Sequence, residues 1–142
     1  MLVEHARNLA GFADASHAEY GSPGTPIITL LSCSLQGKQI EVSLRAGSRL
    51  ARIHGCTTVV ERTTCSYGLA IDLQHLASEA GMRVAAVDAT GEVRAVERPD
   101  HPFFIGTLYQ PQLTSTPAAP HPVFAAFLAA AAAATTRPTG VL

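Results

Sequence analysis

The chain has 142 residues, of which 47% are hydrophobic and 15% charged, and its formal net charge is -1 at pH 7. This length and apolar content predict one domain with a sizeable core. Binding to duplex nucleic acid requires a strong positive surface potential, which a chain of this charge does not have. We therefore expect no nucleic-acid partner. The most apolar run, residues 124–134, is shorter than the ~20 residues of a membrane-spanning helix. With no apolar signal segment among the first fifteen residues, we expect a soluble cytoplasmic protein.

The first part of the chain predicts a helix followed by a β-hairpin. Apolar residues recur at helical spacing over residues 1–11, which a glycine can end. A turn-rich connection at 21–26 leads to a β-branched run over 27–35. A tight turn at 36–38 would fold this run onto 39–44, whose apolar and polar residues alternate. We therefore expect a half-buried antiparallel pair.

The middle of the chain predicts a short helix, a strand and a second helix. Ser48 is typical of an N-cap and precedes a helix over 49–54. Residues 57–63 read as a strand, and a helix beginning near Asp72 would end at Gly81.

The last third predicts three strands and a closing helix. Short strands over 82–88 and 92–97 flank a turn, and the apolar composition of 103–109 predicts a buried strand. Pro122 would open an alanine-rich helix, with a frayed tail over 135–142.

The thiols and imidazoles carry no motif of their own. Cys33, Cys56 and Cys65 form an odd set without Cys-x-x-Cys spacing, which argues against a disulfide framework and a structural zinc site. Cys33 falls on an apolar run and is expected in the core. The six histidines are dispersed, and none has the i, i+4 spacing of a helical metal site. We therefore expect no metal and no cofactor.

The segment that begins at His101 contains Gln110-Pro111-Gln112 and then His121-Pro-Val-Phe. It resembles the closing stretch of the class I glutamine amidotransferase domain found at the C-terminus of CTP synthase. In that family a His-Pro-Glu run supplies the second and third members of a Cys-His-Glu triad. The resemblance implies an α/β fold, a partial class I glutamine amidotransferase-like (flavodoxin-like) domain with a mixed sheet and flanking helices.

Both chemical positions of that run are glutamines here. A thiol that attacks an amide needs a base with a pKa near neutrality, oriented by a third polar or acidic group. Gln110 cannot take the thiol proton, and Gln112 cannot stabilise an imidazolium ion. The ordinary amidotransferase mechanism is therefore not expected, and both amides are expected to tie their loop with neutral hydrogen bonds.

Two further segments resemble the family. Residues 60–69 resemble a segment whose last arginine helps to hold the substrate glutamine, and Ser66 stands in its place. Residues 6–11 and 14–20 resemble the family's Ala-Arg-Asn-Val and Ala-Asn-Ser-Thr-Glu-Phe blocks. The resemblance implies that Glu19 is the one glutamine contact of the family whose residue type is retained. The resemblance implies one substrate pocket formed by Glu19, Cys65, Ser66, Tyr67 and Tyr109.

The resemblance also implies how the chain is divided. Residues 1–134 correspond to the C-terminal part of the amidotransferase-like domain, and 135–142 to a flexible tail. The family's elbow with the nucleophilic cysteine would fall a few residues before Met1, so the elbow and the first strands are expected to be absent. The runs around Cys33, Cys65 and Tyr109 are similar to a divergent stand-alone group, the CTP synthase C-terminal region-related (seleno)proteins.

Three functions remain open from the sequence. The first is a catalytically degenerate pseudoenzyme that binds a small amide ligand or acts as an interaction module. The second is a glutamine-hydrolysing component of CTP synthase, in pyrimidine biosynthesis, completed by an upstream segment or a partner, or else thiol chemistry at Cys65. The third is a structural subunit. Because the truncated first helix would expose apolar surface, we expect a homo-oligomer or a synthetase-like partner.

Overall fold

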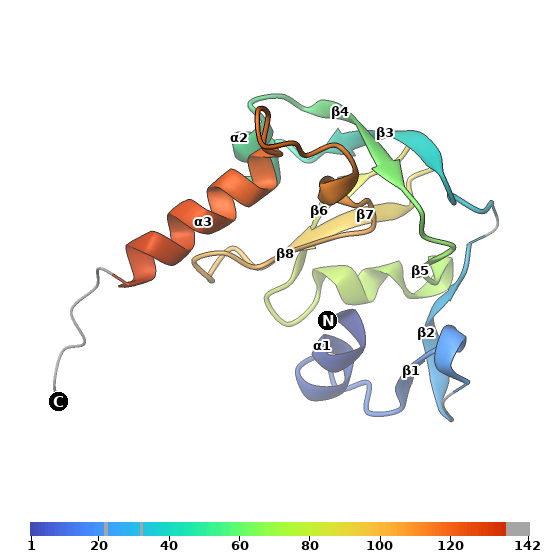
Figure 1. Ribbon diagram of the computed structural model, residues 1–142. Coiled ribbons are helices and arrows are strands. Elements are labelled where there is room, and N and C mark those ends of the chain that lie inside the picture. The colour runs from blue at the N-terminus through green and yellow to red at the C-terminus, as the bar shows by residue number, and fades with distance from the viewer. Residues whose placement is uncertain (22, 32, 136–142) are drawn as a thin grey trace, which may run out of the picture.

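A computed structural model shows two β-sheets flanked by helices (Figure 1). It describes residues 1–21, 23–31 and 33–135. In chain order, with η for short 3₁₀ helices, the elements are α1 (Leu2–Asn8), β1 (Ala15–His17), η1 (Ala18–Tyr20), β2 (Thr25–Leu30), β3 (Lys38–Leu44), α2 (Arg49–His54), β4 (Thr58–Thr63), β5 (Tyr67–Leu69), η2 (Ile71–Ser78), β6 (Arg83–Val87), β7 (Val93–Glu97), β8 (Ile105–Thr107), η3 (Pro111–Leu113) and α3 (Pro122–Thr135).

The small sheet has the strand order β1-β2-β5, and the large one the order β4-β3-β6-β7-β8. The small sheet is mixed, because β1 pairs with β2 in parallel and β5 pairs with β2 antiparallel. All pairs of the large sheet are antiparallel. Helices α2 and α3 lie beside the large sheet, whereas α1 lies with the small one (Figure 1). The expected α/β class with a mixed sheet and flanking helices is confirmed.

The expected hairpin between residues 27–35 and 39–44 is wrong. β2 ends at Leu30 and pairs within the small sheet, whereas β3 pairs with β4 and β6 in the large one. The turn before β3 does form, since the Lys38 amide donates to the Leu35 carbonyl. A turn alone does not choose the partner strand, and the continuous register with β4 from Lys38 to Ser43 gives β3 a longer ladder.

The short helix α2 begins and ends where the sequence predicts. The Ser48 hydroxyl accepts from the Ala51 amide, and Gly55 ends the helix in the left-handed region at φ 69°. The carboxylate of Glu97, a β7 residue that is fully buried, accepts from the Arg49 and Leu50 amides at the same N-terminus. The first turn of α2 is therefore bonded to an interior strand of the large sheet.

Elements after residue 70 agree with the prediction in type but less well in length. The strands over 82–88 and 92–97 are the paired β6 and β7, and the helix expected from Asp72 is the 3₁₀ helix η2. The expected buried strand over 103–109 is only the half-buried β8, because it forms the edge of its sheet. α3 begins at Pro122 and includes Thr135, and the rest of the expected tail, 136–142, lies outside the described residues.

Two apolar cores support these layers. One joins α1, β1, β2 and η2 and includes Ala6, Ile27 and Leu76, and the other joins α2, α3 and the large sheet around Leu50 and Tyr109.

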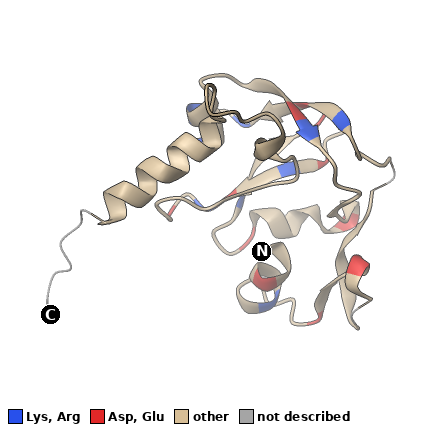
Figure 2. Cartoon of the chain, viewed as in Figure 1, with Lys and Arg blue, Asp and Glu red and all other residues tan. Residues whose placement is uncertain are grey.

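Lys and Arg are spread over several elements rather than gathered on one face (Figure 2). None of the described helices is long and apolar enough to cross a membrane. α3 carries no charged residue and leaves Phe127 and Leu128 exposed, and association through apolar surface remains a prediction.

Candidate functional site

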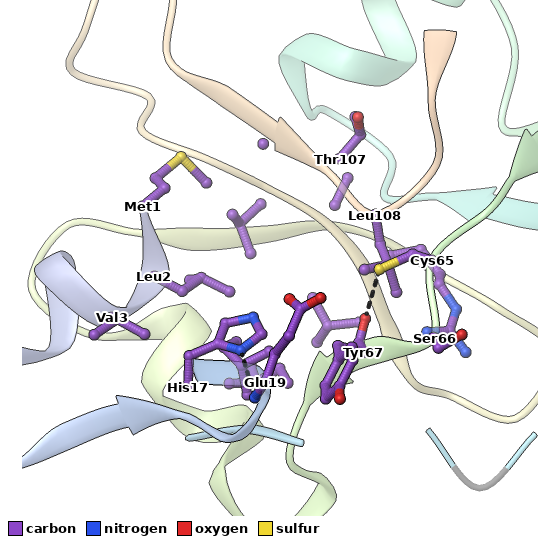
Figure 3. Close-up of a pocket in the computed structure, with 18 of the residues that line it drawn as sticks. Met1, Leu2, Val3, His17, Glu19, Cys65, Ser66, Tyr67, Thr107 and Leu108 are labelled. Carbon is purple, nitrogen blue, oxygen red and sulfur yellow. Dashed lines mark hydrogen bonds between the residues drawn. The ribbon is translucent and has the colours of Figure 1, made fainter. Parts of the chain in front are cut away.

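A cavity of about 630 Å³ lies between the first turn of α1, η1, β5 and the β7–β8 edge (Figure 3). This volume is within the range of small-molecule sites, about 300–1,000 Å³. Its lining includes Glu19, Cys65, Ser66 and Tyr67, which the sequence places in one pocket. The structure thus brings together four residues that are separated by up to about fifty positions in the chain, and their role in binding remains a prediction.

One end of the pocket is built by His17 at the end of β1. His17 caps η1, because its Nδ1 accepts from the Glu19 amide at 3.2 Å. Its ring also lies 5.4 Å from the ring of Tyr67 and 4.9 Å from that of Tyr20. His17 therefore fixes the backbone of Glu19 and, at the same time, contacts the β5 wall, as Figure 3 shows.

The segment between β4 and β5 supplies the opposite wall. The Cys65 thiol donates to the Tyr67 carbonyl at 3.1 Å, and the Cys65 amide donates to the Thr63 hydroxyl at 3.2 Å. The Ser66 carbonyl accepts from the Leu31 amide, which joins this segment to the end of β2. Within the described ranges, no histidine ring makes a hydrogen bond with the Cys65 thiol. The activated thiol pair of a cysteine hydrolase is therefore not formed here.

The other two thiols lie away from the pocket. The expectation that Cys33 is a core residue is wrong, because β2 ends at Leu30 and Cys33 lies exposed in the loop that follows. Cys56 is also exposed, and its thiol donates to the Thr58 carbonyl.

Gln110 fastens the loop that borders the pocket. Its Oε1 accepts from the Thr64 amide at 2.7 Å, and its Nε2 donates to the Leu108 carbonyl at 3.2 Å. Its own amide donates to the Arg62 carbonyl at 3.0 Å. Since Thr64 and Leu108 both line the cavity, this one side chain holds two pocket walls together with neutral hydrogen bonds. Gln112 is exposed in η3, and no side-chain hydrogen bond is found for it in the described part of the chain.

The expectation that Tyr109 lines the pocket is wrong. Its side chain is 1% exposed and lies in the core between α2, α3 and the large sheet. Burial, and after it the negative charge of Glu61, raise the pKa of the Tyr109 hydroxyl far above its ordinary value. The sequence could not show this, because neighbouring residues of an extended segment point to opposite faces, and Leu108 is the one that reaches the cavity.

Sequence reasoning missed His17 and Arg94, which also line the cavity. The Arg94 guanidinium is 3% exposed and pairs with Asp88 and Glu92. Burial alone would raise the pKa of Asp88, but hydrogen bonds from Thr90 and Arg94 outweigh it and hold that pKa below its usual value. Glu19 is exposed, and it makes no ion pair among the residues that the structure describes.

Comparisons with known proteins agree on one family. The chain is 36% identical over 149 residues to the CTP synthase of Caulobacter vibrioides, with 92% of this chain and 27% of that protein covered. The CTP synthase of Brucella anthropi is 36% identical over 148 residues, with 91% and 27% covered. No protein-family model matches.

A solved structure gives the same result for the fold. The glutaminase domain of Trypanosoma brucei CTPS with bound acivicin superposes with a TM-score of 0.84 at 28% identity. This match covers 93% of the chain and 56% of that domain, and the chain spans about a quarter of the length of the curated relatives it matches. The chain belongs to the family of CTP synthase glutaminase domains and has the class I glutamine amidotransferase fold.

Proposed function

We propose that this domain is a catalytically degenerate CTP-synthase-type glutaminase domain whose pocket binds a small neutral or amide-bearing ligand. The observation that carries the proposal is Gln110, which stands at the position that the resemblance gives to the family's catalytic base. Its amide accepts from Thr64 and donates to Leu108, so it acts as a structural tie.

The chemistry of the pocket supports the absence of turnover. A glutaminase must remove a thiol proton and later return a proton to the leaving ammonia, and both steps need a titratable partner beside the sulfur. Cys65 is the one described cysteine that lines the cavity, and its thiol is bonded to a backbone carbonyl. The Gln110 amide does not titrate in water, so it cannot take part in either step.

The charge of the pocket supports a ligand without a carboxylate. Ser66 stands where the resemblance places the arginine that would pair with the carboxylate of glutamine. The Arg94 guanidinium in the lining is already paired with Asp88 and Glu92, and Glu19 adds an exposed negative charge that disfavours a ligand carboxylate and can accept hydrogen bonds from amide or ammonium groups. The T. brucei relative is described with acivicin bound, which supports a small-molecule role for this fold.

We expect L-glutaminamide, in which an amide replaces the α-carboxylate, to bind at least about tenfold more tightly than L-glutamine. Glu19→Gln should weaken L-glutaminamide by about tenfold, because a charged hydrogen bond contributes roughly 1.5–3 kcal/mol. Isothermal titration calorimetry with both compounds measures these differences. Glu41→Gln, on an exposed site of β3, is the matched control and should bind like the wild type.

Tighter binding of L-glutamine, or equal binding by wild type and Glu19→Gln, would contradict the proposed pocket. If neither compound binds, the structural-subunit alternative replaces it. The other alternative is a glutamine-hydrolysing component completed by another segment or partner, which predicts ammonia release once that component is present.

A further inference from the structure

A second polar cluster lies outside the pocket, in the core beneath α2 and the start of α3. His54 ends α2, Glu61 lies on β4, and His121 directly precedes α3. One ligand-type atom from each of these residues lies within 4.8 Å of the others. The His121 Nε2 is 2.9 Å from the Glu61 Oε1, and the two imidazole rings are 5.3 Å apart at an angle of 75°.

Several polar atoms of this cluster are buried without a hydrogen-bond partner. They are the His54 Nε2, the Glu61 Oε2 and, close by, the hydroxyl of Tyr109. Glu61 is 3% and Tyr109 1% exposed, so bulk water does not satisfy them. A buried polar atom without a partner is unfavourable, and a set of them in one place calls for a bound water or ion.

We propose that His54, Glu61 and His121 form a binding site for one divalent transition-metal ion, and that the ion is Zn²⁺. Two imidazoles and one carboxylate are a donor set that holds Zn²⁺ with a fourth position left open. Hard cations such as Mg²⁺ and Ca²⁺ prefer oxygen ligands, so the two imidazoles select against them. The three residues come from three elements that the core already fixes, which gives the site a rigid frame.

His54 offers a ligand atom that is not already engaged. Its Nε2 is buried without a hydrogen-bond partner, so binding a metal ion there breaks no existing hydrogen bond.

One rearrangement is required at His121. Its Nδ1 accepts from the Val123 amide at 3.2 Å, so the Nε2 carries the proton that faces Glu61. To bind a metal through Nε2, the ring must move this proton to Nδ1 and give up the Val123 bond. That exchange gives up one neutral hydrogen bond and gains a bond to the metal ion.

The test uses the full chain, stripped of metal and titrated with Co²⁺ alone. We expect one equivalent to bind, with the visible absorption of a tetrahedral site, and Zn²⁺ to displace it. His54→Gln should weaken Co²⁺ binding by at least about 100-fold, since the loss of outer-shell partners alone costs 10–100-fold. His54 is chosen because it is half-exposed at a helix end, so the variant should fold.

Two controls separate this site from other zinc-binding groups. His75→Gln, at a histidine that is 58% exposed on η2, should bind Co²⁺ like the wild type. Replacing all three cysteines by serine should also leave the affinity unchanged. In the NMR spectrum of the wild type, Zn²⁺ should shift the ring signals of His54 and His121 together. The proposal is overturned if the wild type binds no stoichiometric metal, if His54→Gln binds as tightly as the wild type, or if the cysteine-free variant loses binding.

Discussion

Replacing Glu97 by glutamine should destabilise the fold by about 2–4 kcal/mol, although the new side chain has nearly the same shape. The Glu97 side chain is 1% exposed and lies on β7, an interior strand of the large sheet. Its Oε1 accepts from the Arg49 amide and from the Arg83 guanidinium, and its Oε2 accepts from the Leu50 amide.

The cost arises because one carboxylate accepts hydrogen bonds from two backbone amides and from the Arg83 guanidinium, which otherwise donates only to the Gly47 carbonyl among the described residues. A glutamine amide loses the negative charge, and its NH₂ group must point at a donor, either the guanidinium or the first turn of α2. Urea denaturation measures the change in the free energy of unfolding. Glu41→Gln is the control, because Glu41 is exposed on β3 and should change this free energy by less than about 0.5 kcal/mol. A Glu97→Gln protein as stable as this control would show that the buried carboxylate does not hold α2 to the sheet.

Gly24→Ala should cost about 3 kcal/mol or more, because a side chain at this position meets the main chain. Gly24 has φ +111°, and an added Cβ would lie 2.1 Å from the Asp14 carbonyl oxygen. The same oxygen accepts from the Thr25 amide at 2.9 Å, in the bond that begins the β1–β2 pairing. The added side chain would therefore push β1, the strand that carries His17, away from β2.

Gly21→Ala, in the same connection, is the matched control. Gly21 also has a positive φ, +58°, but nothing lies within 4 Å of its added Cβ. It should cost only the ~1–2 kcal/mol of a left-handed alanine. Urea denaturation gives both values, and hydrogen exchange at the Thr25 amide reports on the strand pairing. Equal costs for the two substitutions would contradict the close approach of Gly24 to Asp14.

The sequence predicted the ends of helices well where a single capping residue determines the end. Ser48 and Gly55 set both ends of α2, and Pro122 sets the start of α3. Strand partners were less predictable. The expected hairpin before β3 failed because pairing depends on which long register is available, and β4 offered a better one than β2.

The pocket was partly predictable for a similar reason. Glu19 and the run from Cys65 to Tyr67 line one cavity, because the chain path of the family is kept, and their role in binding remains a prediction. Tyr109 was misplaced, since the resemblance gives a segment and not the face to which each side chain points. The cluster of His54, Glu61 and His121 carries no local spacing signal, because residues from three separate elements meet only in the folded chain.

Ammonia release from L-glutamine by the purified wild-type chain at neutral pH tests directly whether this domain is catalytically degenerate. We expect no release above a heat-killed control, because the Gln110 amide cannot act as a base and the Cys65 thiol is bonded to the Tyr67 carbonyl. Gln110→His with Gln112→Glu should also remain inactive, since the Cys65 thiol stays bonded to the Tyr67 carbonyl. Steady ammonia release by the wild type that disappears in Cys65→Ser would show that the domain is an active glutaminase and would contradict the account.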